Sequence, residues 1–322
     1  MTRSRALTAG LLAGLLALTG TLALTACGTS GDGVSPSSST RTHSVETAMG
    51  DVEVPVHPRR VVVLDTGELD SALTLGVKPV GATRAATEDG FPSYLAEDDV
   101  RGIKPVGEIA DPDLEAVAAL EPDLILTSKI RDGRRYEQLS AIAPTVMTET
   151  TGTTWKMNFQ VHAAALGRKE AAKKVLSEYD AHIAKVTTAM GGKEKAAATD
   201  ISFVRFVEGS DIRIYGRQNY IGTIFSDLGV GRPPIADKAR DGFSYDVSPE
   251  KVDLADADVV FTSTYGDPAK ARATRTMNSG LWKGLKAYRD GRIFEVDDNL
   301  WIAGIGYTAA HQILDEFQRD LT

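Results

Sequence analysis

The chain has 322 residues, of which 42% are hydrophobic and 25% are charged, and its formal net charge at pH 7 is −8. A chain with this acidic balance is not expected to bind nucleic acid, or to bind a membrane through a basic surface. Its single cysteine, Cys27, excludes an internal disulfide and a metal site built from several thiolates.

The first 26 residues have the pattern of a secretory signal peptide. Arg3 and Arg5 precede a long apolar run that ends in small residues just before Cys27. The segment "LTAC" resembles the bacterial lipobox, whose cysteine is acylated and becomes the new N-terminus after cleavage. The alternative is an ordinary signal peptide that happens to contain a cysteine. On the lipobox interpretation, Cys27 carries a lipid anchor, and two or three acyl chains hold a protein firmly on a bilayer.

Residues 27–43 are rich in Gly, Ser and Thr and poor in apolar residues, so we expect a flexible tether. The remaining part, of about 280 residues, is longer than a usual single-core domain and favours two lobes. No segment beyond Cys27 is long and apolar enough to cross a membrane.

The first half after the tether alternates strands and helices. A hairpin is expected around Gly50 and Asp51, and Val61 to Leu64 read as a buried strand. Short links between the following elements favour a parallel sheet with crossover helices. These elements are a helix over 65–76, a strand over 77–82, a helix and strand over 111–128, and a helix and strand over 134–146.

A single long helix is expected in the middle of the chain. No proline occurs between Pro144 and Pro233, and apolar residues recur every three or four positions from Ala171 to Met190. The pattern predicts an amphipathic helix of about 22 residues, ended by the glycines at 191–192. We interpret it as a rigid connection between the lobes.

The second half repeats the alternation. The pattern therefore predicts an α/β fold in which two β/α lobes, with mainly parallel sheets, are joined by one long rigid helix. The expected divisions are a signal peptide at 1–26, a tether at 27–43, an N-terminal lobe at 44–155, linking helices at 156–192 and a C-terminal lobe at 193–322.

Two segments in the two halves are similar to one another. "DPDLEAVAALEPDLILTS" (111–128) and "DVSPEKVDLADADVVFTS" (246–263) each place a glutamate, Glu115 or Glu250, in the first turn of a helix. Each then continues through an Asp into an apolar strand ending in Thr-Ser. The repetition indicates a pseudo-symmetric body with two lobes.

The motifs "HPRRVVVL", "LGVKPVGA", "DLEAVAALEPDLIL", "LSAIAPTV", "IYG" and "GRIFEVD" occur in the order found in one family. The chain thereby resembles the iron–siderophore (ferrichrome/cobalamin-type) substrate-binding proteins of ABC importers, whose lobes are joined by a helical backbone (class III). The resemblance runs from about residue 44 to the C-terminus.

That resemblance implies a monomeric receptor rather than an enzyme, with no cofactor of its own, since iron enters as a ferric–siderophore complex. Its partners would be an ABC permease dimer with its ATPase, and the membrane through the Cys27 anchor. The lipobox corresponds to the Gram-positive form of the family, held on the extracellular face of the cytoplasmic membrane.

The resemblance also implies that Glu115 and Glu250, one from each lobe, dock into arginine pockets of the two permease subunits. Two exposed anions at a fixed spacing suit a two-fold-symmetric partner with matched cations. The alternative is that both are carboxylates favoured only by a helix dipole.

Ligands of such proteins bind between the lobes, and an arginine suits the chelating oxygens of a ferric siderophore. Arg205 is the main candidate, because it interrupts the apolar strand "ISFVRFV", with Phe203 on the same face. Its alternative is an arginine at a strand end or one paired with a core carboxylate. Arg217, in a loop before a helix, is a second candidate donor.

Aromatic side chains are expected to line the pocket. The family pattern puts an aromatic residue near Trp301, and Trp155, Tyr215 and Tyr265 lie at element junctions or strand ends. Packing in the core is the alternative for each of them. Trp282 is expected to pack a helix onto its lobe.

An acidic protein with one clear strand arginine favours a ferric hydroxamate, such as ferrioxamine or ferrichrome, over a trianionic catecholate or haem. Cobalamin stays possible within the same fold. A bare-metal receptor is disfavoured because none of the five histidines lies at a strand end with a partner. A surface-anchored enzyme is disfavoured because metalloprotease, serine-hydrolase and P-loop motifs are absent from the sequence.

Overall fold

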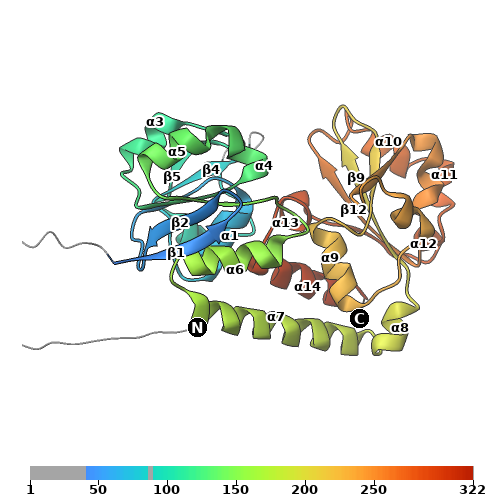
Figure 1. Ribbon diagram of the computed structural model, residues 1–322. Coiled ribbons are helices and arrows are strands. Elements are labelled where there is room, and N and C mark those ends of the chain that lie inside the picture. Colours follow the sequence, from blue (N-terminus) through green and yellow to red (C-terminus); the bar gives the residue numbers. More distant parts are fainter. Residues whose placement is uncertain (1–40, 86–89, 322) are drawn as a thin grey trace, which may run out of the picture. The chain divides into compact units, whose positions relative to one another are not determined.

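The computed structural model describes residues 41–85 and 90–321 (Figure 1). The predicted signal peptide and Cys27 lie outside the described residues, as does nearly all of the tether. None of the helices within the described ranges combines the length and apolar character that crossing a bilayer requires.

An antiparallel hairpin opens the described chain, as its sequence predicts. In it β1 (Thr42–Thr47) pairs with β2 (Gly50–Pro55), with Val45 opposite Val52. The strand begins at Thr42, so the last two residues assigned to the tether belong to the hairpin. The expected boundary at residue 43 is corrected for this reason: Thr42 and His43 pair with Pro55 and Val54.

The N-terminal lobe is built on a six-stranded sheet in the order β6-β5-β4-β3-β7-β8, in which every pairing except β5 with β6 is parallel. Its strands are β3 (Val61–Val63), β4 (Gly81–Arg84), β5 (Lys104–Glu108), β6 (Asp111–Pro112), β7 (Leu124–Ser128) and β8 (Thr145–Thr148). Its helices are α1 (Thr66–Thr74), α2 (Glu97–Val100), α3 (Leu114–Ala119), α4 (Lys129–Asp132), the 3-10 turn η1 (Gly133–Arg135) and α5 (Tyr136–Ile142).

Buried runs of Val, Leu and Ile explain the centre of this sheet. Val61 to Leu64 are almost fully buried, and so are Leu124 to Leu126 on the neighbouring strand. The strand expected at 77–82 instead starts at Gly81, after Pro79, whose nitrogen has no hydrogen to donate to a ladder.

The connection between the lobes consists of α6 (Trp155–Ala165), the 21-residue α7 (Lys169–Ala189) and the short α8 (Lys193–Ala197). α7 confirms the long helix predicted from the apolar spacing. It ends at Gly191 and Gly192, whose φ angles of 98° and 93° favour glycine.

The C-terminal lobe contains a five-stranded sheet in the order β11-β10-β9-β12-β13. β9, β12 and β13 are parallel, whereas β10 runs antiparallel to both of its neighbours, β9 and β11, so this sheet is mixed. Its strands are β9 (Ile201–Val207), β10 (Ile212–Tyr215), β11 (Ser244–Val247), β12 (Val259–Tyr265) and β13 (Ile293–Glu295). Its helices are α9 (Tyr220–Leu228), η2 (Pro234–Lys238), η3 (Pro249–Ala255), α10 (Ala273–Met277), α11 (Gly280–Lys283), α12 (Lys286–Arg289), α13 (Asp298–Trp301) and α14 (Tyr307–Leu321).

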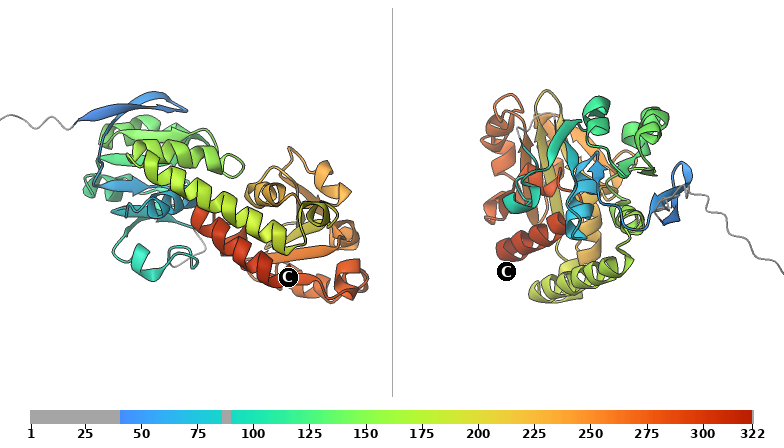
Figure 2. Two further views of the ribbon diagram at one scale, coloured as in Figure 1. Left: turned by 90° about the horizontal axis from the view of Figure 1, so that it is seen from below. Right: turned by 90° about the vertical axis from the view of Figure 1, so that its left-hand side faces the viewer.

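The last helix returns to the lobe connection. α14 lies side by side with α7 and also packs on α1 of the N-terminal lobe (Figure 2). Tyr179 of α7 and Tyr307 of α14 meet edge to face with ring centroids 5.3 Å apart, and Trp155 packs on both rings. Two helices therefore join the lobes where the sequence predicts one.

Candidate ligand-binding cleft

A cleft of about 630 Å³ is lined by residues of both lobes. On the N-terminal side these residues follow the carboxyl ends of β7 and β8, where ligands of open parallel sheets bind. Two exposed apolar side chains, Ile130 (64% exposed) and Phe243 (45% exposed), contribute to opposite walls. The remaining lining residues are Arg131, Thr150, Thr151, Gly152, Thr153, Arg205, Tyr215, Gln218, Asn219, Tyr220, Ile221, Asp241, Trp301, Ile302 and Ile305.

Arg205 lines this cleft, and it is also paired with a carboxylate. Its Nε and Nη2 donate to Asp298 at 2.7 and 2.5 Å, and its side chain is 12% exposed. The pairing with a carboxylate, which the sequence left open as the alternative, is therefore present, and Arg205 also lines the cleft. Burial by itself would lower the pKa of Arg205, but the hydrogen bonds and electrostatic interactions with Asp298 and Tyr215 together outweigh burial, and its pKa is raised.

Tyr265 and Tyr215 hold the Arg205 guanidinium from two other directions. The ring of Tyr265 lies 4.8 Å from the guanidinium carbon, a cation–π arrangement, and Nη1 donates to the Tyr215 hydroxyl at 3.4 Å. Tyr215 lines the cleft, whereas Tyr265 does not. Tyr265 therefore holds the Arg205 guanidinium in place from outside the cleft.

Arg131 is a cleft residue that the sequence reasoning missed. It follows β7 in the short helix α4, and its Nε donates to Asp65 at 2.8 Å. Its side chain is 35% exposed, and neither Nη makes a hydrogen bond to another described residue. The available signal was its position directly after a buried parallel strand, since such strand ends face the ligand in α/β sheets.

The remaining predicted residues are placed differently. Trp301 lines the cleft with little exposure, because its ring stacks on Phe261 at 4.6 Å and its Nε1 donates to Glu316 at 2.6 Å. Phe203 shares a face with Arg205 as predicted, but it is fully buried behind Tyr215 and does not line the cleft.

Trp155 and Arg217 are not brought to the cleft surface either. Trp155 is buried among the rings between the lobes and donates to Thr223 at 2.9 Å. Arg217 is exposed and paired with Asp237 at 2.5 Å, next to the cleft residue Gln218. Trp282 packs on Phe206 in the core of its lobe, as expected.

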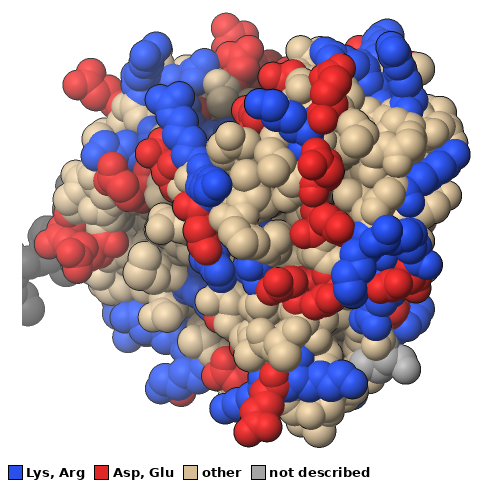
Figure 3. Space-filling model, turned by 90° about the vertical axis from the view of Figure 1, so that its right-hand side faces the viewer, with Lys and Arg blue, Asp and Glu red and all other residues tan. Residues whose placement is uncertain are grey.

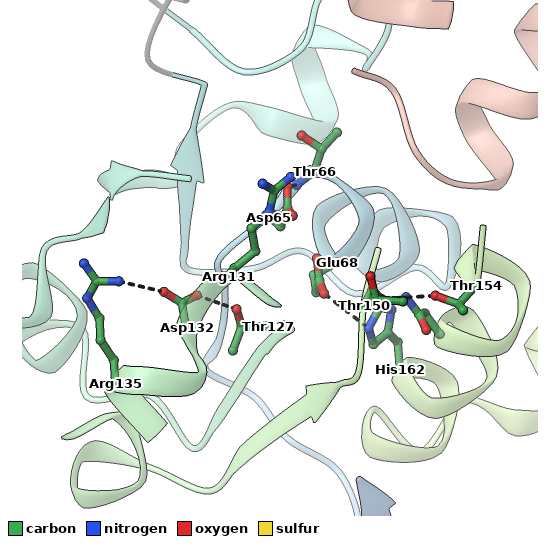
Figure 4. A network of polar contacts seen from close by, with 11 residues as sticks. Asp65, Thr66, Glu68, Thr127, Arg131, Asp132, Arg135, Thr150, Thr154 and His162 are labelled. Carbon is green, nitrogen blue, oxygen red and sulfur yellow. Dashed lines mark hydrogen bonds and ion pairs between the residues drawn. The ribbon is translucent and has the colours of Figure 1, made fainter. Parts of the chain in front are cut away.

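A polar network lies behind Arg131 (Figure 4). Asp65 caps α1 by accepting a hydrogen bond from the backbone nitrogen of Thr66 at 2.7 Å, and its second oxygen holds Arg131. Asp132 accepts from the Thr127 hydroxyl at 2.6 Å and pairs with Arg135 at 3.5 Å. Every arginine in this network therefore has a carboxylate beside it.

No group of three or more His, Cys, Asp or Glu side chains within residues 41–85 and 90–321 is arranged to hold a metal ion. His162 is buried against Ser71. His182 and His311 stack between α7 and α14, with their Nδ1 atoms 2.8 Å apart. These three histidines thus pack helices against one another.

Glu115 and Glu250 are both exposed at helix starts. Glu115 lies in the first turn of α3, which Asp113 caps. Glu250 lies in η3, a 3-10 helix rather than the predicted α-helix, which begins with Pro249 and has a break in its helical geometry at Lys251. A backbone hydrogen bond, Ser248 and two nearby arginines lower the pKa of Glu250.

On the molecular face drawn in Figure 3, basic and acidic side chains are interspersed.

A family model described as periplasmic binding protein matches residues 61–300. The chain belongs to the periplasmic binding protein family. The probable siderophore-binding lipoprotein YfiY of Bacillus subtilis (strain 168) is 37% identical over 308 residues, covering 92% of this chain and 93% of YfiY.

This binding protein also resembles two other relatives. The crystal structure of Staphylococcus aureus SirA complexed with staphyloferrin B superimposes with a TM-score of 0.78 at 32% identity, over 87% of this chain and 98% of SirA. The iron(3+)-hydroxamate-binding protein FhuD of Bacillus subtilis (strain 168) is 28% identical over 85% of this chain and 86% of its own length. The family and fold inferred from the sequence motifs are confirmed, and so is a binding protein rather than an enzyme.

Proposed function

We propose that this binding protein is a lipid-anchored receptor that takes up a ferric siderophore in the cleft and delivers it to an ABC importer. The observation that carries the proposal is the pair Arg131 and Arg205, which line one cleft from opposite lobes. Each guanidinium is fixed by a carboxylate, which leaves part of its planar set of donors for the chelating oxygens of a ligand.

The cleft suits a bulky complex whose iron is already fully coordinated. Ile130, Phe243 and Tyr215 supply apolar and aromatic surface for the organic shell. The receptor needs no metal ligands of its own, because iron arrives inside the complex. In this proposal Arg131 and Arg205 contact the ligand, and the buried rings of Tyr215 and Trp301 form the cleft wall directly behind the contact surface. The other predicted residues (Phe203, Trp155, Tyr265 and Arg217) support this wall from behind or from the rim.

Charge balance favours a ferric hydroxamate as the ligand. Arg131 and Arg205 are each compensated by a carboxylate, Asp65 and Asp298, and Asp241 adds a negative charge to the lining. A trianionic catecholate complex or haem would gain little from cations that are already paired. Ferrioxamine and ferrichrome complexes are nearly neutral or slightly positive, and they meet no such mismatch.

The proposal extends to the partners. A monomer anchored through Cys27 on the extracellular face of the membrane would present Glu115 and Glu250 to the two subunits of an ABC permease. Both glutamates are exposed, and they occupy corresponding places in the two lobes.

A fluorescence titration of the mature protein tests the ligand. Ferrioxamine B, ferrichrome, ferric staphyloferrin B, a ferric tris-catecholate and cobalamin are added separately, and quenching of tryptophan emission is recorded. We expect saturable quenching by a hydroxamate at submicromolar concentration. The Trp301→Phe variant should lose more of this quenching than Trp282→Phe, because only Trp301 lines the cleft.

The other outcomes test the receptor function and the class of ligand separately. A response to staphyloferrin B, the catecholate or cobalamin alone keeps the receptor and overturns the hydroxamate. Absence of quenching with all five ligands would overturn the siderophore receptor and would favour a haem receptor, a bare-metal receptor or a surface enzyme.

A further inference from the structure

Glu68 is a buried carboxyl group that the proposed binding site leaves unexplained. It lies one helical turn after Asp65 on α1, and only 2% of its surface is exposed. The charged or titratable groups facing it are Asp65 at its own helix cap, Arg131 and Asp132 from α4, and His162 from α6 (Figure 4). Glu68 therefore lies between the arginine of the cleft and a buried histidine.

The hydrogen-bonding pattern around Glu68 suits a protonated acid. Apart from its own backbone N–H, no described donor hydrogen-bonds to its carboxyl group. His162 Nε2 lies 3.6 Å from Glu68 Oε1, and that nitrogen has no hydrogen-bond partner among the described residues. The other ring nitrogen, Nδ1, lies 3.0 Å from the Ser71 hydroxyl.

A small void supports the same arrangement. It has a volume of about 10 Å³ and is lined by Glu68, Ser71, Asn158 and His162, together with residues from the start of α6 and from the segment before α14. This is about the space of one water molecule. A single water there could accept a hydrogen bond from the protonated carboxyl group of Glu68 and donate one to His162 Nε2, which bridges their separation of 3.6 Å.

The buried pair has two possible states, a neutral acid with a neutral imidazole, or a carboxylate with an imidazolium. Burial of both groups favours the neutral state, because two charges would lose their hydration. Burial, and then the nearby Asp65, raises the pKa of Glu68 to about 8. Burial lowers the pKa of His162 to about 3.

We propose that Glu68 holds a proton in the working receptor, and that this proton keeps the charge behind Arg131 balanced for ligand binding. With Glu68 neutral, the buried carboxylates Asp65 and Asp132 match Arg131 and Arg135, and Arg135 also pairs with Asp111, which is exposed to solvent. Loss of the proton adds one negative charge, which competes with the ligand oxygens for Arg131. Glu68 is thus a positioning residue that acts through Arg131.

Ligand binding at the cleft and proton binding by Glu68 are therefore linked. This linkage rests on the proposed function of the cleft. A ligand that binds through Arg131 favours the neutral form of Glu68, so protonated receptor binds more tightly. Affinity should fall as the pH rises through the titration of Glu68. Near pH 8, binding should also take up a fraction of a proton from the solvent.

Infrared spectroscopy of the ligand-free mature protein tests the proton directly. The carboxylic-acid C=O stretch at pH 7 is compared between wild type and Glu68→Gln, with Glu170→Gln, an exposed glutamate on α7, as the matched control. We expect one protonated carboxyl band that is missing only in Glu68→Gln and that disappears from wild type as the pH rises past about 8. Equal spectra at pH 7 would overturn the proposal, whatever the ligand is.

Calorimetry with ferrichrome, a neutral hydroxamate complex, tests the coupling. Wild type should lose about threefold or more in affinity between about pH 7 and pH 9.5, whereas Glu68→Gln should keep a flat profile. If Glu68→Gln fails to fold, the coupling is tested on wild type alone. Proton uptake on ligand binding is then measured at pH 8 in buffers of different ionisation enthalpy. No proton uptake, or the same pH profile in both proteins, would overturn the coupling. Absence of ferrichrome binding at every pH would instead count against the hydroxamate ligand, and the infrared result would still decide on the proton.

Discussion

Asp70, on α1 of the N-terminal lobe, accepts a hydrogen bond from the backbone nitrogen of Thr308 at 3.1 Å. Its second oxygen accepts from the nitrogen of Ala309, also at 3.1 Å, so a carboxylate from one lobe caps the closing helix α14. Gly306, with φ of 153°, makes room for this contact, since a Cβ there would collide with the carboxylate. The cap ties the first lobe helix to the last helix of the chain.

We expect Asp70→Ala to lower the free energy of unfolding by about 1–2 kcal/mol, the usual cost of losing a helix cap. Urea unfolding monitored by circular dichroism measures it. Asp180→Ala, which removes an exposed aspartate of α7, is the matched control and should change little. Equal losses in the two variants would show that the cap contributes nothing specific.

Arg131→Ala should weaken binding of the ligand identified by titration about tenfold or more, which is the scale of a lost hydrogen bond to a charged group. Arg131→Lys should restore only part of the affinity, because lysine lacks the planar set of donors. The thermal midpoint should also fall, because Asp65, whose side chain is only 2% exposed, would lose its cation. Unchanged affinity in Arg131→Ala would remove this residue from the site.

Arg205→Ala should reduce affinity by about tenfold or more and should also destabilise the fold. The added loss of stability is expected because Asp298 would stay buried with the Ser263 hydroxyl and without its cation. Calorimetric binding and thermal unfolding on the same preparation measure both effects. A stable variant with normal affinity would exclude Arg205 from the site.

Charge reversal of the two exposed glutamates, Glu115→Lys with Glu250→Lys, should abolish iron uptake by cells while ligand affinity stays unchanged. Both side chains lie outside the cleft lining, and a partner with matched cations would be repelled. Glu170→Lys, another exposed helix glutamate, is the control and should support uptake. Reduced affinity in the double variant would instead assign these residues to the pocket or to folding.

The stacked pair His182 and His311 should make the protein less stable in mild acid. Burial lowers the pKa of both imidazoles below 6.5, and each ring also experiences neighbouring charges. Below about pH 6.5 the unfolded chain binds protons that the folded pair resists, so the free energy of unfolding falls as the pH decreases. The facing groups are Asp315, Glu178 and Lys185.

Urea unfolding at several pH values between about 5 and 7.5 measures this effect. His311→Gln should flatten the acid slope, whereas replacement of the exposed His57 by Gln should leave it as in wild type. A slope that is identical in all three proteins would contradict the role of the pair.

Cys27→Ser should release the receptor from the membrane into the culture medium, because it removes the proposed site of acylation. Fractionation followed by immunoblotting measures the distribution, and a Ser30→Ala variant in the predicted tether is the control. Retention of Cys27→Ser in the membrane fraction would show that another segment holds the protein there.

The sequence predicted those helices and strands whose formation depends on residues close to one another in the chain. The apolar run from Val61 to Leu64, the spacing between Ala171 and Met190, and the repeated Glu-to-strand pattern depend on neighbours within a few turns. Those features correctly predicted the hairpin, the buried strands, the 21-residue α7 and the two-lobe α/β architecture. The ordered motifs then identified the family.

The sequence by itself determined which segments form buried strands and helices, because period and composition act within a few residues. Only the tertiary structure decided which side chains meet at the cleft. Arg205 is paired with Asp298, 93 positions along the chain, and Arg131 with Asp65, 66 positions away. Phe203 and Trp155 were both predicted to line the cleft, yet packing buries both side chains. Arg131, in the segment "KIRD" that carries no recognisable motif, does line the cleft. No local pattern specifies such partners, since the contacts that bury or expose a side chain come from segments far away in the chain.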